Sequence, residues 1–543
     1  MNFTILAILI ITVLGLYFRI LPYDNVQGLW NDEYVGWYIS QQPLFLPFIK
    51  GILSQCHMPL YYVCLKIYTA ILGNSDVVLR LSSFITGFLS IFVMFFVGNQ
   101  KNKILGYLCA LFTAISAFVI YYSYEVRPYS LIFLLSALSL LYTIKLLEDD
   151  KDKKNIIFYI LFNVLILLTH TLGFIYVLTN MFVVAYYLKD RNLKYTRNIF
   201  LSIGVLFLLL TPVFIKIFTT ISFSQWWGVS SLSKLAFMFT DIYSNYLVNL
   251  INAPANFFSA IGWGFFLLGV VPATICIIGL INSLFIENEY AKSLFLIPTI
   301  PTVVLILASF SSKFVFLTKY NTEAYPILIF LALYGLLNIK RSHLKYGLIV
   351  VLFLLNISIL FTKTFQQNFY KPESNKLVAE LLEHSQLKPH DIILFTYYPR
   401  ERFSKYFDYS EYEIREIHKG NFFYYLTPNT TYEQAVLNGK KLYQPVYTSN
   451  ANPYFTSKVE EEFYQNLKSG RKLAVVFLNS VSMLSDVQIY SIASNKNIYK
   501  NYPQPYLIFS YVKNFLIKKM YEDLKMTRYE QNGNWSVVVF EKP

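Results

Sequence analysis

The sequence is short of charge. Only 14% of its 543 residues are Asp, Glu, Lys or Arg, whereas 55% are hydrophobic and the mean hydropathy is +0.44. Soluble domains carry about 25% charged residues, so the composition excludes an ordinary soluble protein for most of the chain. We therefore expect a polytopic α-helical membrane protein.

Cysteines and metal-binding motifs are also scarce. Four scattered cysteines exclude a disulfide framework, in which cysteines are dense and regularly spaced. No His-Glu-x-x-His pattern or other recognisable ligand spacing occurs. We expect no metal and no other cofactor; the alternative is a divalent metal held by His57, His170 and nearby carboxylates.

Negative charge is the scarcer sign, with 32 Asp and Glu against 46 Lys and Arg. A net charge of +14 raises the question of whether the protein binds nucleic acid, but the basic residues gather in loops between the predicted spans. Clusters at residues 151–154, 189–197 and 340–345 fall in loops on one side of the predicted bundle, as the positive-inside rule requires of cytoplasmic loops. The positive excess is therefore topological, and no nucleic-acid partner is expected.

Long apolar runs are abundant. Runs of about 17 to 25 apolar residues can cross a bilayer as helices, and we count about eleven. They are centred near residues 11, 88, 113, 137, 162, 180, 208, 270, 302, 331 and 355. Residues 155–188 are too long for one span and have basic flanks at both ends, which predicts two spans joined at His170 and Thr171. This topology places residues 22–78, residues 219–258 and the chain after about residue 364 outside.

The first outer loop, residues 22–78, has aromatic and amphipathic stretches broken by prolines. Pro43, Pro47 and Pro59 divide it into pieces that suit short helices lying in the membrane interface. This loop and the predicted spans form one transmembrane module over residues 1–365.

The rest of the chain, residues 366–543, has the mixed composition of a soluble domain. The runs DIILFTY and KLAVVFLN predict strands, and residues 373–386 repeat apolar positions at helical spacing. Residues 527–542 predict a hairpin that turns at Asn532 and Gly533. We predict a C-terminal exoplasmic α/β or α+β domain.

Polar and ionisable residues gather at the outer ends of the predicted spans. Such groups are costly at a bilayer boundary unless they reach water, a partner or a substrate, so they mark a candidate site. They are Asp32, Glu33, His57, Glu125, Arg127, His170, Lys319, Tyr320 and Glu323. A carboxylate beside fixed cations suits a reaction in which a hydroxyl loses its proton while a lipid phosphate leaves without a metal. Polyprenyl-phosphate sugars are donors of this kind.

Each candidate also has a plain structural alternative. The acidic pair at 32–33 can be solvated loop charge, and Glu125 can pair with Arg127. His57 can cap the helix that follows it, and His170 can be no more than the tip of a hairpin. Lys319 can extend along apolar surface towards water.

The order and spacing of these motifs resemble the GT-C class of integral-membrane glycosyltransferases. The similar branch contains the protein O-mannosyltransferases and the lipid A aminoarabinose transferase. The resemblance runs over residues 1–340 and rests on WNDEY, HMPLYYVCLKIYTAILGNSDVVLRLSSFITGFLSI, EVRPYSLIFLLSALSL, LTHTLGF and KYNTEAYPILIFLALYGL. It implies a GT-C fold and a polyprenyl-phosphate sugar donor.

The resemblance also implies roles for individual residues. The catalytic carboxylate maps onto Asp32 and Glu33, with Asp32 as the base, and Arg127 maps onto a donor-phosphate contact. Lys319 and Tyr320 map onto a second phosphate-binding pair. The substrate-binding residues are expected to be His57, which opens an H/K-x-P-L motif, together with Glu125 and His170.

Two positions depart from the pattern of that branch. Met58-Pro59 stands where a Pro-Pro pair is common, and Lys319 stands where an Arg is common. Lysine keeps the positive charge but loses the bidentate fork of a guanidinium, so its phosphate contact is altered.

The resemblance implies an inverting membrane glycosyltransferase on the outer face of a bacterial cytoplasmic membrane. Its partners would be the polyprenyl-phosphate sugar, a lipid, glycan or protein acceptor, and membrane lipids. One alternative is an oligosaccharide ligase or polymerase with lipid-diphosphate donors, which typically has a large late outer loop, whereas residues 311–323 form a short one. The other is a lipid or glycan transporter, which predicts charged span centres and internal repeats that the sequence lacks.

Overall fold

The chain forms two compact units. The computed structural model describes residues 3–25, 28–53, 57–149, 152–188, scattered positions between 197 and 215, 266–286, 289–309, 318–362, 365, 374–395, 404–416, 471–478, 524–532 and 535–541. The helical unit comprises Met1–Val26 and Val35–Tyr370, and the C-terminal unit comprises Gln27–Tyr34 and Lys371–Pro543.

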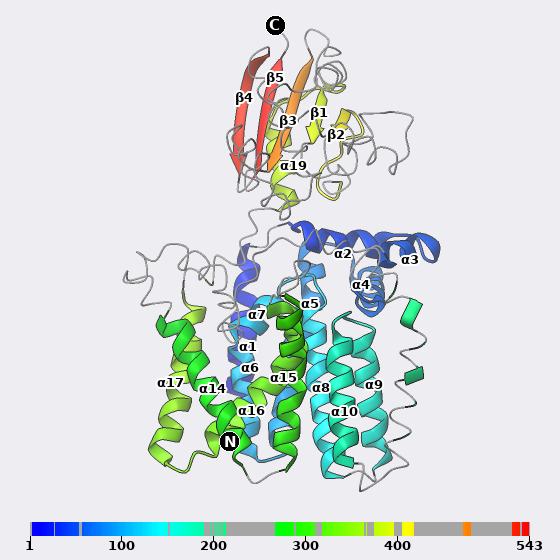
Figure 1. Ribbon diagram of the computed structural model, residues 1–543. Coiled ribbons are helices and arrows are strands. Elements are labelled where there is room, and N and C mark those ends of the chain that lie inside the picture. The colour runs from blue at the N-terminus through cyan, green and yellow to red at the C-terminus, as the bar shows by residue number, and fades with distance from the viewer. Residues whose placement is uncertain are drawn as a thin grey trace, which may run out of the picture. The chain divides into compact units, whose positions relative to one another are not determined.

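The helical unit is a bundle of apolar helices that stand side by side (Figure 1). Among the described residues, five helices are long and apolar enough to cross a membrane: α1 (Phe3–Ile20), α5 (Asp76–Asn99), α8 (Tyr129–Glu148), α15 (Glu289–Ser309) and α17 (Ser342–Leu360). Shorter helices complete the bundle: α6 (Lys103–Ala114), α7 (Ala117–Tyr122), α9 (Lys153–Leu167), α10 (Gly173–Leu188), α14 (Val271–Leu284) and α16 (Tyr325–Leu337). All but one of the predicted spans coincide with these helices, and the span near residue 208 is described only at scattered positions. The predicted polytopic helical fold is confirmed.

The long apolar stretch at 155–188 is two helices, as predicted. Helix α9 ends at Leu167 and α10 begins at Gly173, so His170 and Thr171 lie in the turn between them. The turn is held by its own backbone, because the amide of Gly173 donates to the carbonyl of His170 at 3.1 Å. His170 is thereby fixed at the end of the bundle and not within a span.

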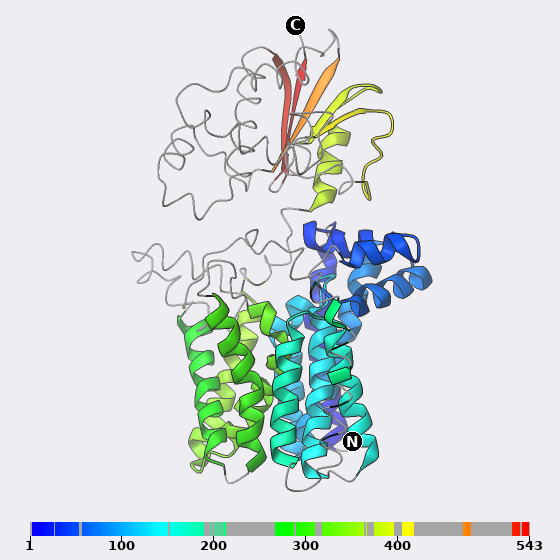
Figure 2. The same cartoon turned by 45° about the vertical axis from the view of Figure 1, so that its right-hand side comes forward.

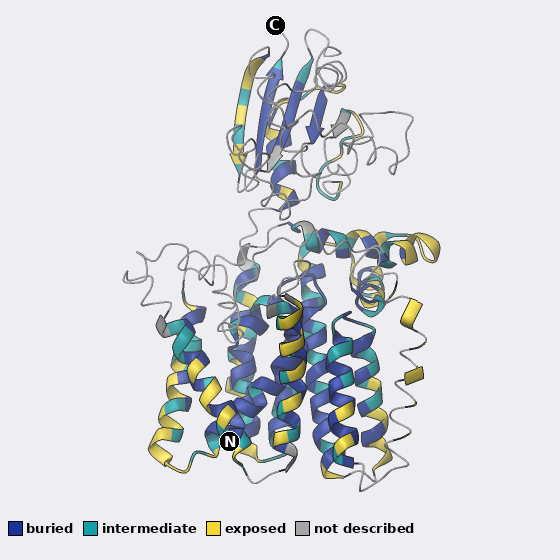
Figure 3. Ribbon diagram, in the orientation of Figure 1, coloured by how far each residue is buried: buried dark blue, intermediate teal, exposed yellow. Residues whose placement is uncertain are grey.

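Helix α8 is mostly buried, whereas much of α17 is exposed (Figure 3). Over an apolar stretch of 18 residues in each helix, 72% of the residues of α8 are buried, against 22% for α1 and for α17. Uncharged polar side chains join α8 to α9 and α10: Asn180 Nδ2 donates to Ser139 Oγ at 3.2 Å and to Asn163 Oδ1 at 3.3 Å. Such contacts between helices satisfy polar groups that lipid cannot.

Helices α14 and α16 cross at two glycines. A Cβ atom built on Gly335 would lie 1.8 Å from the carbonyl oxygen of Gly279, and one on Gly279 would lie 2.2 Å from that of Ala332. Asn282 Nδ2 donates to the carbonyl of Gly335 at 2.7 Å across the same crossing. The backbones are therefore in direct contact, as small residues permit in membrane helices.

We expect Gly335→Val to destabilise the helical unit, because the new side chain would force α14 and α16 apart. Overpacking of this kind costs about 1–3 kcal/mol. Thermal unfolding of the purified protein in detergent measures the loss. Gly347→Val on α17 is the matched control, since a Cβ there meets nothing within 4 Å. Equal melting temperatures for the two variants would contradict the close crossing.

Short helices lie across one end of the bundle (Figures 1 and 2). They are α2 (Asn31–Gln41), which enters the helical unit at Val35, α3 (Leu46–Leu53) and α4 (Pro59–Leu72). Pro59 stands in the first turn of α4, where its missing N–H costs no hydrogen bond. The turn before α3 exposes 81% of Phe45. The predicted short helices are confirmed, and an exposed aromatic residue of this kind suits a membrane interface.

The C-terminal unit contains a mixed five-stranded sheet in the order β2-β1-β3-β5-β4. Strand β1 pairs in parallel with β2 and β3, whereas β3–β5 and β5–β4 are antiparallel. The elements are α19 (Asn375–His384), β1 (Ile392–Phe395), β2 (Glu413–Glu416), β3 (Lys472–Leu478), β4 (Lys525–Asn532) and β5 (Trp535–Glu541). The predicted strands, helix and hairpin are confirmed, although Gly533 of the predicted turn lies outside the described residues.

Helix α19 packs on the sheet through the apolar face that the sequence predicts. Leu377, Val378, Leu381 and Leu382 join a buried core with residues of β1, β3 and β5. The core is small, so polar contacts at its edge supplement it.

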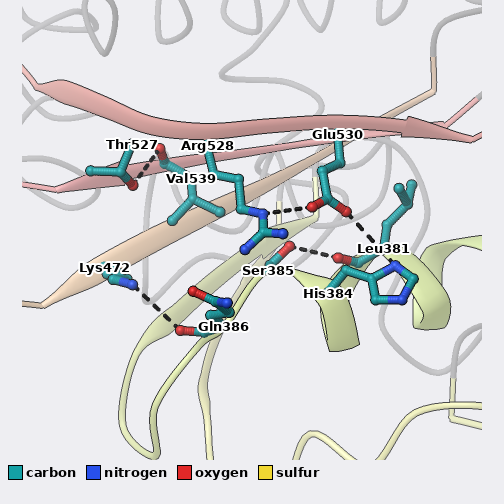
Figure 4. A network of polar contacts seen from close by, with 9 residues as sticks. All are labelled: Leu381, His384, Ser385, Gln386, Lys472, Thr527, Arg528, Glu530 and Val539. Atoms are coloured by element: carbon teal, nitrogen blue, oxygen red, sulfur yellow. Dashed lines mark hydrogen bonds and ion pairs between the residues drawn. The ribbon is translucent and has the colours of Figure 1, made fainter.

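These polar contacts link the end of α19 to β3 and β4 (Figure 4). Arg528 Nε donates to Glu530 Oε1 at 2.5 Å, and the other oxygen of Glu530 lies 3.9 Å from His384 Nδ1. Lys472 Nζ donates to the carbonyl of Gln386 at 3.4 Å. Because these groups are exposed or half-exposed, each contact stabilises the unit only slightly.

Candidate functional site

The centre of the site is a buried contact between His57 and Arg127. His57 precedes α4, and Arg127 lies in the turn between α7 and α8. Arg127 Nη2 lies 2.7 Å from His57 Nε2. A guanidinium can only donate, so Nε2 must accept and the imidazole proton must be on Nδ1.

That proton on Nδ1 has a consequence for ligand binding. Nδ1 of His57 is buried and has no hydrogen-bond partner among the described residues. Burial and the neighbouring Arg127 guanidinium hold the pKa of His57 well below its usual range, so the ring is neutral near pH 7. The site therefore presents a fixed, neutral N–H donor that needs an acceptor.

A second buried pair lies beside the first. His170, at the α9–α10 turn, has its Nδ1 at 2.5 Å from Oε1 of Glu323, and both side chains are 3% exposed. Glu323 comes from the 3₁₀ helix η7 (Thr318–Ala324), which leads into α16. The two residues are 153 positions apart in the sequence.

The backbone brings the two histidines together. His57 and His170 form an antiparallel β-bridge, and their rings stack with centroids 5.5 Å apart. The amide of Leu60 donates to the carbonyl of Leu168 at 2.8 Å, which extends the link. The ring of Tyr129 stands edge-on to both imidazoles, at 6.0 Å and 6.2 Å.

Lys319 and Tyr320 complete the cluster. Lys319 Nζ lies 5.8 Å from the ring centroid of Tyr129 and 5.7 Å from that of Tyr320. Tyr320 is buried, whereas Lys319 is half-buried. The positive charges of the Lys319 ammonium and the Arg127 guanidinium both lower the pKa of His57. The cluster therefore carries two fixed cations close to one neutral donor.

Glu125 lies in the turn between α7 and α8 and contacts the preceding helix, α7. Its Oε1 accepts a hydrogen bond from Tyr121 Oη at 2.7 Å, and its carbonyl accepts from Ser83 Oγ at 2.5 Å. The amide of Arg127 also donates to this carbonyl, at 2.8 Å. These contacts shape the turn that presents Arg127, and they give Glu125 a structural role beside its predicted role in substrate binding.

The acidic pair occupies the first turn of α2. Glu33 is fully buried, and its Oε2 accepts from the amide of Trp30 at 3.3 Å, as the acid of a capping box does. Asp32 is half-buried one position earlier. Both carboxylates are favoured by the positive end of the helix dipole, but their positions differ in accessibility.

The acidic pair and the cationic cluster belong to different units. Residues 27–34 are part of the C-terminal unit, whereas the cluster around His57 is part of the helical unit. Among the described residues, no three His, Cys, Asp or Glu side chains are grouped as metal ligands. The ring nitrogens His57 Nε2 and His170 Nδ1 face Arg127 and Glu323.

Two members of the cluster had no role assigned from the sequence. Glu323 stands out in KYNTEAYP as an ionisable residue at a span end, but its partner His170 is not apparent from sequence spacing. Tyr129 carries no such signal, because tyrosine is common throughout the chain, at 45 residues.

We expect Glu323→Ala to destabilise the protein strongly. Breaking a buried pair leaves a desolvated group without its partner, at a cost of about 3 kcal/mol. Glu148→Ala is the matched control, because its pair with Lys101 is exposed and worth less than about 1 kcal/mol. Thermal unfolding of both variants measures the difference. A loss for Glu323→Ala no larger than for Glu148→Ala would contradict the buried pair.

Part of the helical unit matches a known protein family. Residues 56–217 match the family described as dolichyl-phosphate-mannose-protein mannosyltransferase. This segment contains His57, Arg127 and His170. No curated protein sequence matches the chain.

Solved structures match almost the whole chain. ArnT from Cupriavidus metallidurans in the apo state has a TM-score of 0.52 and 12% identity over 98% of this chain and 97% of that chain. The same protein bound to undecaprenyl phosphate has a TM-score of 0.51 and 11% identity over the same shares. The oligosaccharyltransferase from Archaeoglobus fulgidus, tethered to an acceptor peptide, has a TM-score of 0.50 and 10% identity over 99% of this chain and 88% of that chain. The chain therefore has the GT-C fold, and the predicted resemblance is confirmed.

Proposed function

We propose that this multi-pass membrane protein of the GT-C fold transfers a sugar from a polyprenyl-phosphate donor to an acceptor hydroxyl. The observation that carries the proposal is the buried cluster in which two cations and a fixed N–H donor come together. Such a cluster suits a phosphate monoanion or dianion better than a neutral group. ArnT, which shares the fold, binds undecaprenyl phosphate.

Arg127, Lys319 and His57 would bind the phosphate of the donor lipid. A phosphate oxygen would accept the hydrogen bond from Nδ1 of His57, which otherwise has no acceptor in the described part of the chain. The guanidinium and the ammonium would stabilise the charge that grows on the phosphate as it leaves. Tyr320, packed beside Lys319, would lie next to the bound phosphate.

Asp32 would act as the general base. It would accept the proton of the acceptor hydroxyl while that oxygen forms a bond to the anomeric carbon. The bond from the anomeric carbon to the phosphate oxygen would break, and its electron pair would leave with the polyprenyl phosphate. Attack opposite the leaving group inverts the configuration at the anomeric carbon. Glu33, which caps α2, would hold the first turn that presents Asp32.

The reaction would occur on the outer face of a bacterial cytoplasmic membrane. The distribution of lysine and arginine in the loops supports this orientation. The same orientation makes the C-terminal unit exoplasmic and the acceptor a lipid, glycan or protein outside the cytoplasm.

Lipid-phosphate binding tests the donor class. We expect the purified full-length protein in nanodiscs to bind undecaprenyl phosphate more tightly than undecaprenyl diphosphate, measured by native mass spectrometry. The one-phosphate lipid fits a cluster with two cations, and the diphosphate adds charge without a further cation in the described part of this cluster. Tighter binding of the diphosphate would instead favour an oligosaccharide ligase or polymerase.

A further inference from the structure

The segment that carries the acidic pair is held by the C-terminal unit. Residues Gln27–Tyr34 group with Lys371–Pro543, although the sequence places them in the first loop of the membrane module. The segment leads directly into α2, whose first turn contains Asp32 and Glu33.

Leu29 has both of its backbone polar groups bound within this unit. Its amide donates to Tyr406 Oη at 2.7 Å, and its carbonyl accepts from the amide of Asn375 at 3.1 Å. The Leu29 side chain is fully buried. Nearby, Tyr34 Oη lies 3.5 Å from Ser404 Oγ. The segment is thus bound at both of its ends.

Gly28 allows the amino end of α19 to approach closely. A Cβ atom on Gly28 would lie 2.3 Å from Cβ of Lys376 and 2.7 Å from Oγ of Ser374, so another residue would displace the helix. Ser374 is the N-cap of α19 and accepts from the amide of Lys376. The contact is therefore made by the rigid end of a helix.

A short and well-bonded path runs from Leu29 to Asp32. Trp30 follows Leu29, and its amide donates to Glu33 in the first turn of α2. Asp32 is the second residue of that helix. With Leu29 fixed on one side and the helix cap formed on the other, little conformational freedom remains at Asp32.

We propose that the C-terminal unit is a positioning element for the transfer reaction, in which Tyr406 and the amino end of α19 fix Leu29 and thereby the place of Asp32. This inference rests on the proposed function for its chemical meaning. A displacement of about 1 Å at a reacting group can lower the rate about 10²-fold. A hydrogen bond that fixes Asp32 from a distance can therefore affect the reaction rate.

Hydrogen exchange tests the physical link without any substrate. We expect Tyr406→Phe, which removes only the hydroxyl, to speed deuterium uptake over residues 28–34 by about fivefold, the equivalent of one net hydrogen bond. Tyr529→Phe is the matched control, because Tyr529 Oη contacts Gln531 and Ser536, which belong to the β4–β5 hairpin. Unchanged uptake over residues 28–34 in Tyr406→Phe would overturn the proposal.

Turnover and lipid binding test the consequence for the reaction. We expect Tyr406→Phe to lower kcat with a polyprenyl-phosphate sugar by about tenfold while the affinity for undecaprenyl phosphate stays unchanged, because the base and not the phosphate site moves. Gly28→Ala, which disturbs the contact with the amino end of α19, should likewise lower kcat and leave the affinity for undecaprenyl phosphate unchanged. Equal losses of rate and lipid affinity, or no loss of rate, would overturn the positioning role. If Asp32→Asn turned over normally, the proposed base would be wrong, and the exchange result would be unaffected.

Discussion

Asp32→Asn is expected to lower kcat for glycosyl transfer by about 10²–10⁴-fold, the usual contribution of a general base. The amide keeps the size and polarity of the side chain but cannot accept the acceptor's proton. Because Asp32 is half-buried in the first turn of α2 and is not part of the cluster around His57, folding and undecaprenyl phosphate binding should be kept. Turnover and lipid binding by the purified variant measure the two effects separately.

Glu33→Gln is the matched control for that experiment. Glutamine keeps an acceptor oxygen for the amide of Trp30, so the capping box survives. We expect this variant to stay within about tenfold of the wild-type rate, because glutamine keeps the size of the side chain and the helix cap. Normal turnover by Asp32→Asn would contradict the base assignment. A far larger loss in Glu33→Gln than in Asp32→Asn would move the base to Glu33.

Arg127→Met is expected to lower the affinity for undecaprenyl phosphate by about 100-fold, since one charge-assisted contact of up to about 3 kcal/mol is lost. Arg127→Lys should be intermediate, because the ammonium keeps the charge without the planar fork. Arg341→Met is the control, as this arginine is exposed at the start of α17. Native mass spectrometry in nanodiscs measures the three affinities.

Arg127→Met should also change how the phosphate affinity depends on pH. In the wild type, burial and Arg127 keep the pKa of His57 low, so the ring stays neutral and phosphate affinity changes little on mild acidification. Without Arg127 the pKa of His57 rises, so the ring gains a proton as pH falls and supplies the missing positive charge. Burial, the larger cause of the low pKa, remains in the variant, so we expect Arg127→Met to regain phosphate affinity only at acid pH, below about pH 6.5. An affinity independent of pH would contradict the placement of His57 at the phosphate.

Much of the fold could be predicted from the sequence because the membrane imposes strong local rules. A span needs about 20 apolar residues, and basic flanks fix its direction, which is why the turn at His170 was found. In the C-terminal unit, the helical spacing of Leu377, Val378, Leu381 and Leu382 predicted the face of α19 that packs on the sheet. These signals lie within a few neighbouring residues.

The pairings inside the candidate site could not be predicted in this way. Glu323 and His170 meet only because α9, α10 and η7 bring their ends together, and no spacing in the sequence records it. The Arg127–His57 contact likewise joins two turns. Glu125 is another example, since its carboxylate accepts a hydrogen bond from Tyr121 Oη, a tyrosine that no motif singles out.

The division of the chain into units was also beyond the sequence. Residues 27–34 follow the first span closely, which predicts a loop of the membrane module. The structure assigns them to the C-terminal unit through the backbone of Leu29, which bonds with Tyr406 and Asn375. The backbone groups of any residue other than proline could make these two hydrogen bonds. The residue type at position 29 therefore does not predict them.

Mass spectrometry of lipid-linked sugars and surface glycans, in a strain that lacks this protein, tests the proposed activity most directly. We predict that one polyprenyl-monophosphate sugar accumulates while a surface glycan, glycolipid or glycoprotein loses the mass of that sugar. The wild-type chain should reverse both changes, and Asp32→Asn should reverse neither. Unchanged polyprenyl-monophosphate sugars, or accumulation of a lipid-diphosphate oligosaccharide in their place, would contradict the proposed transfer reaction.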